Sequence, residues 1–553
     1  MSFLVSNSAG SFGLFGIKSR YQGLFFSHQG KVFRTISHFD LKGSPGAVLN
    51  EFWKASRDRE GVQESFWFAP RLPVFFYELS SPAKVDAILD CKLNFDNREW
   101  GRNYHFSFED KVLLIHFEKL NDAREQSGPE FDFWLALYGC EFEILDKWER
   151  ASYPFDELRN SPPFSRWVLR GFRASDSFVV AFSASKEDAL KLAKSSWKSR
   201  EKLAKAAEKQ AVVKANHIKN GDFRTAFECA QYSLLCLNCE TGLYAGLPWF
   251  HQRWARDELV CVKALLHSGQ ESLAKSILFD WLEKLQGWKL PGALNEAAAD
   301  CWLFLRFEDY LTSLKKKEKE YILEKLSSYL SEVENNLQKG LVVNGAKETW
   351  MDSVDRSGAR IEIQALVLAA CRLSRLLGKE VELEQRLKED VKKAFWRKKY
   401  LADGADDDLV RPNVFIAAYA YPELLSKKEW ISCFDFVLPR LWLSWGGLST
   451  INKSDRSYVK EHSGENSKSY HSGDSWFWVN NLAALVLFAF DKKKYKNHIQ
   501  HILKAGANEI LYEGVIGHHA ELSSASELRS EGCLAQAWSA ALFVELVEEL
   551  FRK

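Results

Sequence analysis

The sequence predicts a multidomain protein, with an N-terminal β-sandwich-like domain followed by an all-α (α/α)6 barrel. With 553 residues the chain is too long for one ordinary hydrophobic core, so two or more domains are expected. Short runs of β-branched and aromatic residues fill the first part of the chain, whereas apolar residues at helical spacing dominate the remainder. We therefore expect a β-rich domain over residues 1–185, a helical linker over 186–220 and a helical barrel over 221–553.

Three runs illustrate the strands of the N-terminal part, namely Tyr104–Phe108, Val112–Phe117 and Phe178–Phe182. Each is short and rich in β-branched or aromatic residues, and many such strands are typical of a β-sandwich. Helix signals are scarce here, although Ala47–Ala55 is a candidate helix. Lys186–Gln210 is instead rich in Ala, Lys and Glu, which predicts a solvated helix that connects the two domains.

After residue 220, about twelve segments carry apolar residues at i, i+3 and i+4, separated by loops that hold Trp, Gly, Asp and His. An (α/α)6 barrel has that many helices, and its functional residues would lie on loops at one end. A helical solenoid is the competing layout, but no repeat of fixed period is present. The predicted helices are Phe223–Leu237, Asp257–His267, Gln270–Leu285, Asn295–Leu314, Lys317–Gln338, Ile361–Leu377, Val381–Phe395, Asn413–Tyr421, Lys427–Leu441, Val479–Ala489, Tyr495–Glu509 and Ala535–Phe551.

Composition and charge argue against several classes of function. The net charge is +1 and the pI about 7.6, so nothing indicates binding to nucleic acid or to an anionic membrane. The sequence has no apolar run of membrane-spanning length, no secretory signal pattern and no disulfide spacing among its ten cysteines, which predicts a cytoplasmic protein. Cys236 and Cys239 form a single C-x-x-C pair without His partners, which is weak evidence for metal or redox chemistry, so no metal site is expected.

Five stretches after residue 240 combine aromatic rings with carboxylates or a histidine. In Tyr244–Asp257, two Trp, a Phe and a His accompany an Arg-Asp pair. The C–H faces of a sugar stack on flat rings while its hydroxyls bind fixed charged groups, so this composition suits a carbohydrate site. The alternative is a Trp-rich core turn with an internal salt bridge. The other stretches are Ala299–Trp302, Glu348–Val354 ahead of Glu362, Tyr470–Trp478, and Ala520–Leu522 ahead of Gly532–Ser539.

Cleavage of a glycosidic bond needs two carboxyl groups across the bond. One donates a proton to the leaving oxygen, and in an inverting enzyme the other activates a water molecule. The carboxylates of these stretches are far apart in sequence, as expected if they converge at the mouth of a barrel. Singly, some residues have structural explanations: Asp300 as a helix N-cap, Glu362 as a structural carboxylate and His471 as a residue that orders a loop.

Together these stretches resemble the amylo-α-1,6-glucosidase part of glycogen debranching enzymes and their prokaryotic relatives. The resemblance covers most of the chain and is most specific at Thr349–Asp352, which matches T-W-M-D, and at Gln536–Ser539, which matches Q-A-W-S. It is weaker at the N-terminal Ser6–Ser11 and Ser19–Leu24. The remaining similar segments are Gly246–Phe250 with Trp254–Asp257, Ala299–Trp302, Ile361–Leu366, Tyr470–Gly473 with Trp476, and Gly532–Cys533.

The resemblance implies an (α/α)6 catalytic barrel and inverting removal of a single α-1,6-linked glucose, with Asp352 as general acid and Glu521 as general base. Asp352 should then keep its proton in a poorly solvated site beside Trp350, and the two carboxyl groups should lie roughly 6.5–9.5 Å apart. The other expected site residues are Arg256 and Asp257 at the hydroxyls of the terminal glucose, Trp249, Trp254, Trp350 and Trp476 as stacking walls, and Phe250, Asp300, Glu362, His471 and Trp538.

Three departures from the family pattern leave the substrate preference open: Ala255 in place of Gly, Gln22 in place of His, and Val354–Gly358 in place of a longer loop. The expected substrate is glycogen or a branched α-glucan oligosaccharide, and hydrolysis needs no cofactor. One alternative is a glucoamylase-like hydrolase of α-1,4 or other α-glucosides such as trehalose. The other is a catalytically inactive glucan-binding protein.

Overall fold

A computed structural model describes residues 1–121, 128–213, 215, 217–291, 297–299 and 301–552. The chain divides into two compact units. The first comprises Met1–Lys214, Leu235–Glu240 and Val515–Gly517, and the second comprises Ala215–Leu234, Thr241–Gly514 and His518–Lys553.

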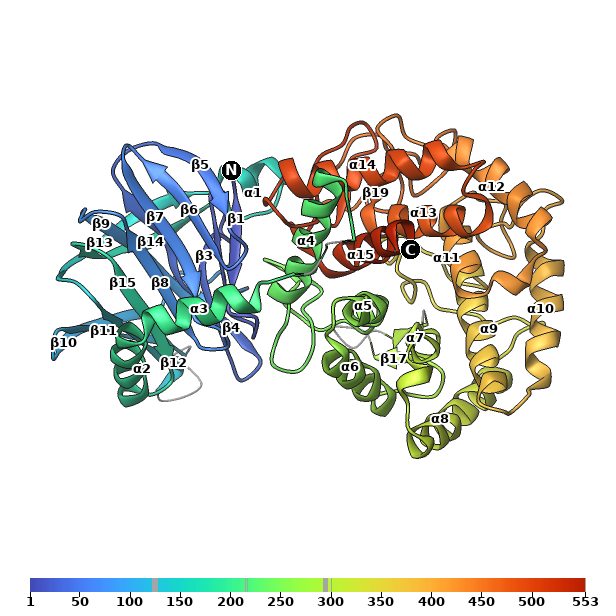
Figure 1. Cartoon of the computed structure of the whole chain (residues 1–553), viewed down its shortest axis with the longest axis horizontal. Helices are drawn as coiled ribbons and strands as arrows, with labels where there is room; N and C mark the ends of the chain where they lie inside the picture. Colours follow the sequence, from blue (N-terminus) through green and yellow to red (C-terminus); the bar gives the residue numbers. More distant parts are fainter. Residues whose placement is uncertain (122–127, 214, 216, 292–296, 300, 553) are drawn as a thin grey trace. The chain divides into compact units, whose positions relative to one another are not determined.

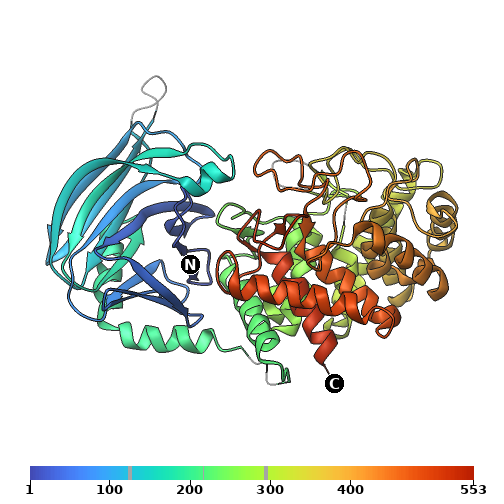
Figure 2. The ribbon, with the colours of Figure 1, turned by 90° about the horizontal axis from the view of Figure 1, so that it is seen from above.

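Two antiparallel sheets form most of the first unit (Figures 1 and 2), which confirms the predicted β-rich N-terminal domain. The strand orders are β1-β2-β3-β4-β9-β14-β13 and β10-β11-β12-β15-β8-β7-β6-β5. The first sheet consists of β1 (Phe3–Ser6), β2 (Phe12–Phe15), β3 (Gly23–His28), β4 (Lys31–Leu41), β9 (Val85–Leu93), β13 (Phe142–Ser152) and β14 (Ser165–Ala174). The second consists of β5 (Pro45–Asn50), β6 (Lys54–Arg59), β7 (Val62–Phe68), β8 (Val74–Leu79), β10 (Arg102–Glu109), β11 (Val112–Leu120), β12 (Pro129–Tyr138) and β15 (Phe178–Ser183).

Alternation of side chains along the strands explains how the two sheets pack. In β7, Phe66 belongs to a core cluster with residues of both sheets, while the next residue, Trp67, belongs to a second cluster on the opposite face. Helix α2 (Lys186–Lys198) contributes Ala189 and Ala193 to this second cluster. The sheet that contains β7 is therefore buried on both faces, by the other sheet and by α2.

Two helix predictions in this unit need revision. Ala47–Ala55 is not a helix, because β5 and β6 meet there at a turn. In this turn the side-chain oxygen of Asn50 accepts the backbone N–H of Phe52 at 2.9 Å, and Phe52 has a left-handed φ of 67°. The single helix predicted over Lys186–Gln210 is two helices, α2 and α3 (Arg200–Gln210), separated at Ser199.

A closed ring of helices forms the second unit (Figure 1). Helices α5, α7, α9, α11, α13 and α15 each contact the next in this order, and α15 returns to contact α5. Further helices pack against this ring: α6 contacts α5, α8 and α10 contact α9, and α12 and α14 contact α13. The helices are α4 (Gly221–Cys236), α5 (Ala255–His267), α6 (Glu271–Glu283), α7 (Leu303–Asp309), α8 (Lys316–Asn335), α9 (Ile361–Leu376), α10 (Glu382–Phe395), α11 (Asn413–Ala420), α12 (Lys427–Leu441), α13 (Phe477–Asp491), α14 (Lys496–Tyr512) and α15 (Ala537–Phe551).

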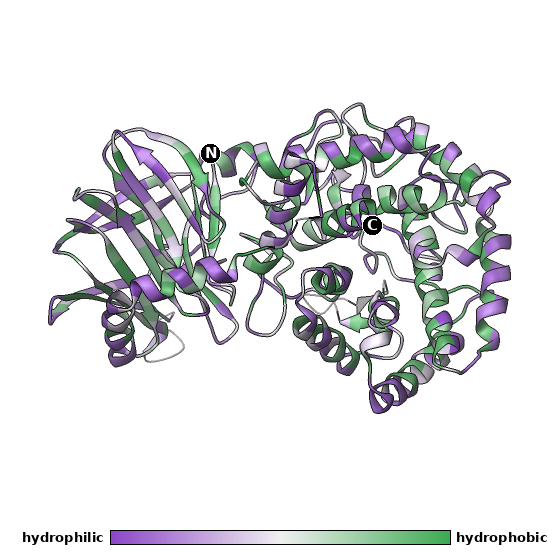
Figure 3. Ribbon diagram, viewed as in Figure 1, coloured by the Kyte–Doolittle hydropathy of each residue, from purple (hydrophilic) through white to green (hydrophobic). Residues whose placement is uncertain are grey.

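Burial distinguishes the helices of the ring from those packed against it. Helix α13 is buried continuously from Phe477 to Leu487, whereas α10 buries a stripe of apolar residues spaced four apart, Leu383, Leu387, Val391 and Phe395. Hydrophilic residues recur along α8 and α10 (Figure 3). A helix that is apolar all round is enclosed, while one with a single apolar stripe faces solvent. In the described part of the chain, no helix combines the length and the apolar character that crossing a membrane would require.

The predicted helix Asn295–Leu314 begins later than expected. Ala297–Ala298 forms strand β18, which pairs with β17 (Leu290–Pro291), and α7 begins only at Leu303. Residues 292–296 and 300 lie outside the described residues. Alanine favours helices, but strand pairing with a neighbouring segment overrides that local preference here.

Candidate active site

The candidate site lies where helices α5, α13 and α15 of the ring begin. Two short antiparallel pairs join the segments that precede these helices. β16 (Gly246–Leu247) pairs with β21 (Ala535–Gln536), and β19 (Ser475–Trp476) pairs with β20 (Leu522–Ser523). The pairing of β16 with β21 therefore makes neighbours of stretches that are hundreds of residues apart in sequence.

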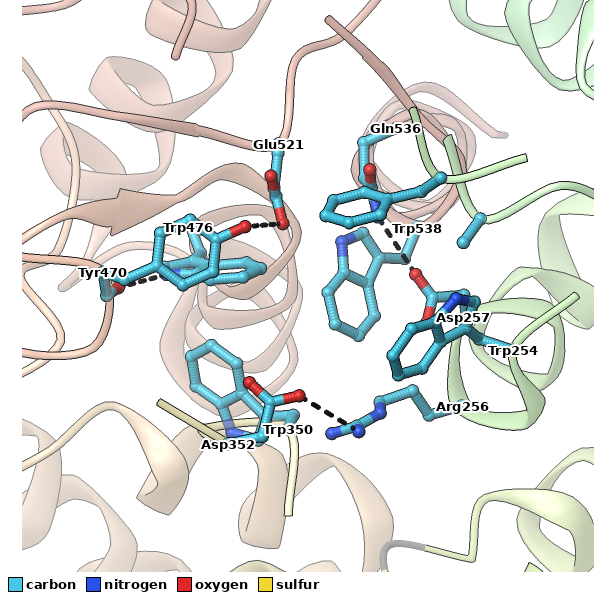
Figure 4. Close-up of a pocket in the computed structure, with 12 residues that line it drawn as sticks. Trp254, Arg256, Asp257, Trp350, Asp352, Tyr470, Trp476, Glu521, Gln536 and Trp538 are labelled. Carbon is cyan, nitrogen blue, oxygen red and sulfur yellow. Dashed lines mark hydrogen bonds and ion pairs between the residues drawn. The ribbon is translucent and has the colours of Figure 1, made fainter. Parts of the chain in front are cut away.

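A cavity of about 210 Å³ opens among these segments. This volume is below the roughly 300–1,000 Å³ of pockets that hold drug-sized ligands, so it suits one sugar ring better than an oligosaccharide. Figure 4 shows Glu521 and Asp352 on opposite sides of the pocket, with indole rings between them. The lining residues are Ala245, Phe250, Trp254, Arg256, Asp257, Trp350, Asp352, Tyr470, Trp476, Glu521, Gln536 and Trp538.

Glu521 is a buried carboxyl group held by two hydrogen-bond donors. Its Oε1 accepts the hydroxyl of Tyr470, and its Oε2 accepts the backbone N–H of Cys533 at 2.8 Å. Burial raises the pKa of Glu521 to about 7, although both hydrogen bonds act in the opposite direction because they stabilise the anion. Burial and the adjacent Glu521 raise the pKa of Tyr470 well above its usual value, so the tyrosine stays a donor. Glu521 therefore changes charge near neutral pH.

Asp352 lies in a more open place than expected. Its side chain is 33% exposed, and its Oδ2 lies 3.4 Å from Nη2 of Arg256. The predicted poorly solvated site beside Trp350 is therefore wrong, because the carboxyl group of Asp352 reaches both solvent and a guanidinium group. Arg256 and the next residue, Asp257, belong to the first turn of α5, and Asp257 accepts a hydrogen bond from Nε2 of Gln536 at 3.0 Å.

Indole rings form much of the pocket wall. The ring centroids of Trp350 and Trp476 lie 5.4 Å apart and those of Trp476 and Trp538 lie 5.8 Å apart, both edge to face. The ring N–H of Trp350 donates to the side-chain oxygen of Asn413 at 2.7 Å, and that of Trp476 donates to the carbonyl of Tyr470 at 2.7 Å. Because the ring N–H groups of Trp350 and Trp476 already have partners, these two rings offer the pocket apolar surface suited to sugar C–H groups.

His471 is close to the pocket but is not among its described lining residues. It is fully buried, stacks on Trp476 with 4.9 Å between ring centroids, and its Nδ1 accepts the backbone N–H of Ser353 at 3.3 Å. Burial lowers the pKa of His471 well below its usual value, so the ring is neutral. His471 therefore orders the loop that carries Asp352, which was the structural alternative for this residue.

Glu362 and Trp249 are also outside the described lining of the pocket. Glu362 forms a buried ion pair with Arg356, whose Nη2 also lies 2.9 Å from Oδ1 of Asp403. This supports the structural reading of Glu362. Trp249 is buried, with 8% of its surface exposed. The remaining predicted site residue, Asp300, lies outside the described residues.

Tyr470 and Gln536 line the pocket although neither was a predicted site residue. Both belong to stretches already noted for their aromatic residues. Tyr470 precedes His471 directly, and Gln536 lies two residues before Trp538. The sequence could have indicated these two residues only through their polar side chains, which stand next to predicted site residues. The carboxyl groups that they hydrogen-bond, those of Glu521 and Asp257, are distant in sequence.

Two carboxyl groups on opposite sides of one pocket can divide proton donation and proton acceptance between them. The surrounding rings can hold a sugar ring in place, and Arg256 and Asp257 can bind its hydroxyl groups. Among the described residues, no cluster of three or more His, Cys, Asp or Glu side chains is arranged to bind a metal ion.

A family model and solved structures relate the chain to known proteins. A family model described as amylo-alpha-1,6-glucosidase matches residues 206–545, more than half of the chain. The structure of a bacterial glucoamylase complexed with acarbose has 11% sequence identity and a TM-score of 0.65, over 99% of this chain and 93% of that chain. At this identity the similarity concerns the fold alone. The mannosylglycerate hydrolase from Thermus thermophilus in complex with glucose has 12% identity and a TM-score of 0.46, over 60% of this chain and 100% of that chain. No curated protein sequence matches the chain.

Proposed function

Since the chain belongs to the amylo-alpha-1,6-glucosidase family of glycoside hydrolases, we propose that it releases glucose from α-1,6 branch points by inverting hydrolysis. The proposed substrate is glycogen or a branched malto-oligosaccharide. One observation carries the proposal: Asp352 and Glu521 lie on opposite sides of one tryptophan-walled pocket. A pocket that suits one sugar ring is consistent with an enzyme that removes one glucose at a time.

The proposal includes an (α/α)6 barrel as the catalytic scaffold. The closed ring from α5 to α15 supplies the inner helices, and α4, α6, α8, α10, α12 and α14 are the proposed outer helices. The fold similarity to a bacterial glucoamylase over nearly the whole chain supports this assignment.

The exposure of the two side chains supports Asp352 as the general acid and Glu521 as the general base. In an enzyme that releases the terminal sugar, the glucose occupies the enclosed end of the pocket and the rest of the chain points to solvent. The acid protonates the oxygen between the two, so it belongs at the more open side, where Asp352 is 33% exposed. Glu521 is only 3% exposed, which suits the enclosed side, where the base would act on a water molecule beside the glucose.

In the proposed reaction Glu521 takes a proton from a water molecule, whose oxygen bonds to C1 of the glucose. The bond from C1 to the glycosidic oxygen breaks, and Asp352 gives its proton to that oxygen. Water attacks opposite to the leaving chain, so an α-linked glucose leaves as the β anomer. Arg256 and Asp257 bind hydroxyl groups of the glucose and hold it between the carboxyl groups.

The test compares the glucose released from three substrates by the full-length protein: an oligosaccharide with a single α-1,6-linked glucose, a linear α-1,4 oligosaccharide and trehalose. Early NMR spectra should show β-glucose, released fastest from the branched substrate. Asp352→Asn should lower this rate by about 10²–10⁴-fold, the usual contribution of a general acid. Asp355→Asn, on the same loop but exposed, is the matched control and should keep the rate.

Each alternative function has its own outcome in this test. Faster release from the linear substrate or from trehalose would favour the glucoamylase-like hydrolase. The α anomer as first product would contradict inversion. Glucan binding without glucose release, unaffected by Asp352→Asn, would leave only the inactive glucan-binding protein.

A further inference from the structure

Three tryptophans of the first unit are unusually exposed for their size. Trp100 is 46% exposed, Trp148 is 41% exposed and Trp167 is 43% exposed. Each contacts Arg102 or Lys119, Trp167 through its backbone carbonyl, and these two cations lie directly opposite each other on β10 and β11. Tryptophan is highly buried on average, and a group of exposed rings marks an interaction surface rather than chance exposure.

The two cations lie against the rings of Trp100 and Trp148 and bind the backbone of Trp167. The Nζ of Lys119 lies 4.0 Å from the ring centroid of Trp100 and donates to the carbonyl of the same residue. The guanidinium carbon of Arg102 lies 4.9 Å from the ring centroid of Trp148, and its Nη1 donates to the carbonyl of Trp167 at 2.8 Å. Rings that are fixed before binding lose little freedom when a ligand stacks on them.

The exposed charges beside Trp100 are paired with each other. Arg98 pairs with Asp96 at 2.9 Å and with Glu130 at 2.8 Å, and Arg102 pairs with Asp90 at 3.1 Å. The surface therefore presents the Arg98–Glu130 pair beside Trp100, whereas Arg102 and Lys119 are buried and out of reach of a ligand. It combines flat rings with charged groups that can accept or donate hydrogen bonds, which complements an uncharged ligand rich in hydroxyl groups.

We propose that the tryptophan cluster, Trp100, Trp148 and Trp167, binds an α-glucan chain at a second site on this protein. The proposal rests on the proposed function for the identity of the glucan. The active-site pocket suits one sugar ring, so the rest of a polymer lies outside it. The cluster gives that polymer a separate attachment point, which concentrates the enzyme on polysaccharide without a role in bond cleavage.

The test separates binding of a polymer from turnover of a small substrate. Migration of the full-length protein in native gels that contain glycogen gives the affinity, and kcat/KM for a short branched oligosaccharide gives the activity. Combined replacement Trp100→Ala, Trp148→Ala and Trp167→Ala should weaken glycogen binding by at least about tenfold. It should leave kcat/KM for the short substrate within about twofold, because no cluster residue lines the pocket.

Phe108→Ala is the matched control, since Phe108 is 53% exposed on the same unit but is not part of the cluster. If the combined variant does not fold, Trp100→Ala alone is used, and a melting curve establishes that each variant is folded. Unchanged glycogen retardation in a folded cluster variant overturns the proposal, as does a wild-type protein that glycogen does not retard. A dimer in light scattering that the variant abolishes would assign the cluster to self-association instead. Retardation that depends on the cluster but no glucose release would sustain this inference while the proposed function fails.

Discussion

At the scale of single residues, the contact between Tyr470 and Glu521 determines the expected pH dependence. Glu521 must be ionised to act as a base, so activity should fall as the pH drops through its pKa of about 7. The hydrogen bond from Tyr470 lowers that pKa, and Tyr470→Phe removes it. The pKa of Glu521 should then rise, and the acid-side fall of kcat/KM should move to higher pH.

The measurement is a pH profile of kcat/KM on a short branched substrate for the wild type and Tyr470→Phe. Tyr512→Phe, at a position 64% exposed, is the control and should leave the profile in place. A profile that stays fixed, or moves to lower pH in Tyr470→Phe, would show that Glu521 does not control this limb.

Single residues also show how far sequence reasoning reaches toward the site. Asp352, Glu521 and Arg256 were predicted from their motifs, and all of them line one pocket. Tyr470 was not, because the carboxyl group that it hydrogen-bonds lies 51 positions away in the chain. The exposure of Asp352 was also mispredicted, since a neighbouring Trp in sequence says nothing about which side of a cavity a carboxyl group faces.

At the scale of elements, the loop before α9 depends on a buried ion network. Arg356 pairs with Glu362 on α9 and with Asp403, and it donates to Oγ1 of Thr349 at 2.9 Å. Arg356→Met would leave the buried Glu362 without its cation and Asp403 with only the more distant Arg360 and Arg411. We expect a loss of about 3–5 kcal/mol in the free energy of unfolding, the usual result of breaking a buried pair.

Urea denaturation of the wild type and Arg356→Met measures this loss. Arg375→Met is the control, because Arg375 pairs with Glu384 at 3.1 Å but its side chain is 42% exposed. The control should cost less than about 1 kcal/mol, as surface ion pairs do. Equal losses for the two variants would contradict the idea that Arg356 fixes this loop.

Elements differ in how well local sequence predicts them. Helix α10 has apolar residues at a spacing of four, and its predicted start differs from the observed one by a single residue. Residues 297–298 were predicted as helix but pair as a strand with β17. Ala47–Ala55 was a predicted helix, yet a left-handed Phe52 makes a strand turn there. Both failures come from tertiary pairing or backbone conformation that periodicity cannot encode.

At the scale of the whole molecule, the change in sequence pattern near residue 185 did predict a β-rich part followed by a helical part. Strand alternation and helical spacing are periodic over many residues, so one residue that breaks the pattern does not change the prediction. The closure of the ring, in which α15 contacts α5, joins the two ends of the helical part. Such closure has no local signature and follows only when the helix number and the lengths of the connections are considered together.

The separate interiors of the two units lead to a prediction for thermal unfolding. Phe66 is fully buried in the core between the sheets, and Phe66→Ala should destabilise the first unit by about 3–5 kcal/mol. Glucose should bind the folded second unit, where a concentration of 100 times the dissociation constant adds about 2.7 kcal/mol. In differential scanning calorimetry, Phe66→Ala should lower one transition by about 2–4 °C per kcal/mol, and glucose should raise the other. A single transition that responds to both would mean that the units unfold as one cooperative body, because neither core could then melt while the other stays folded.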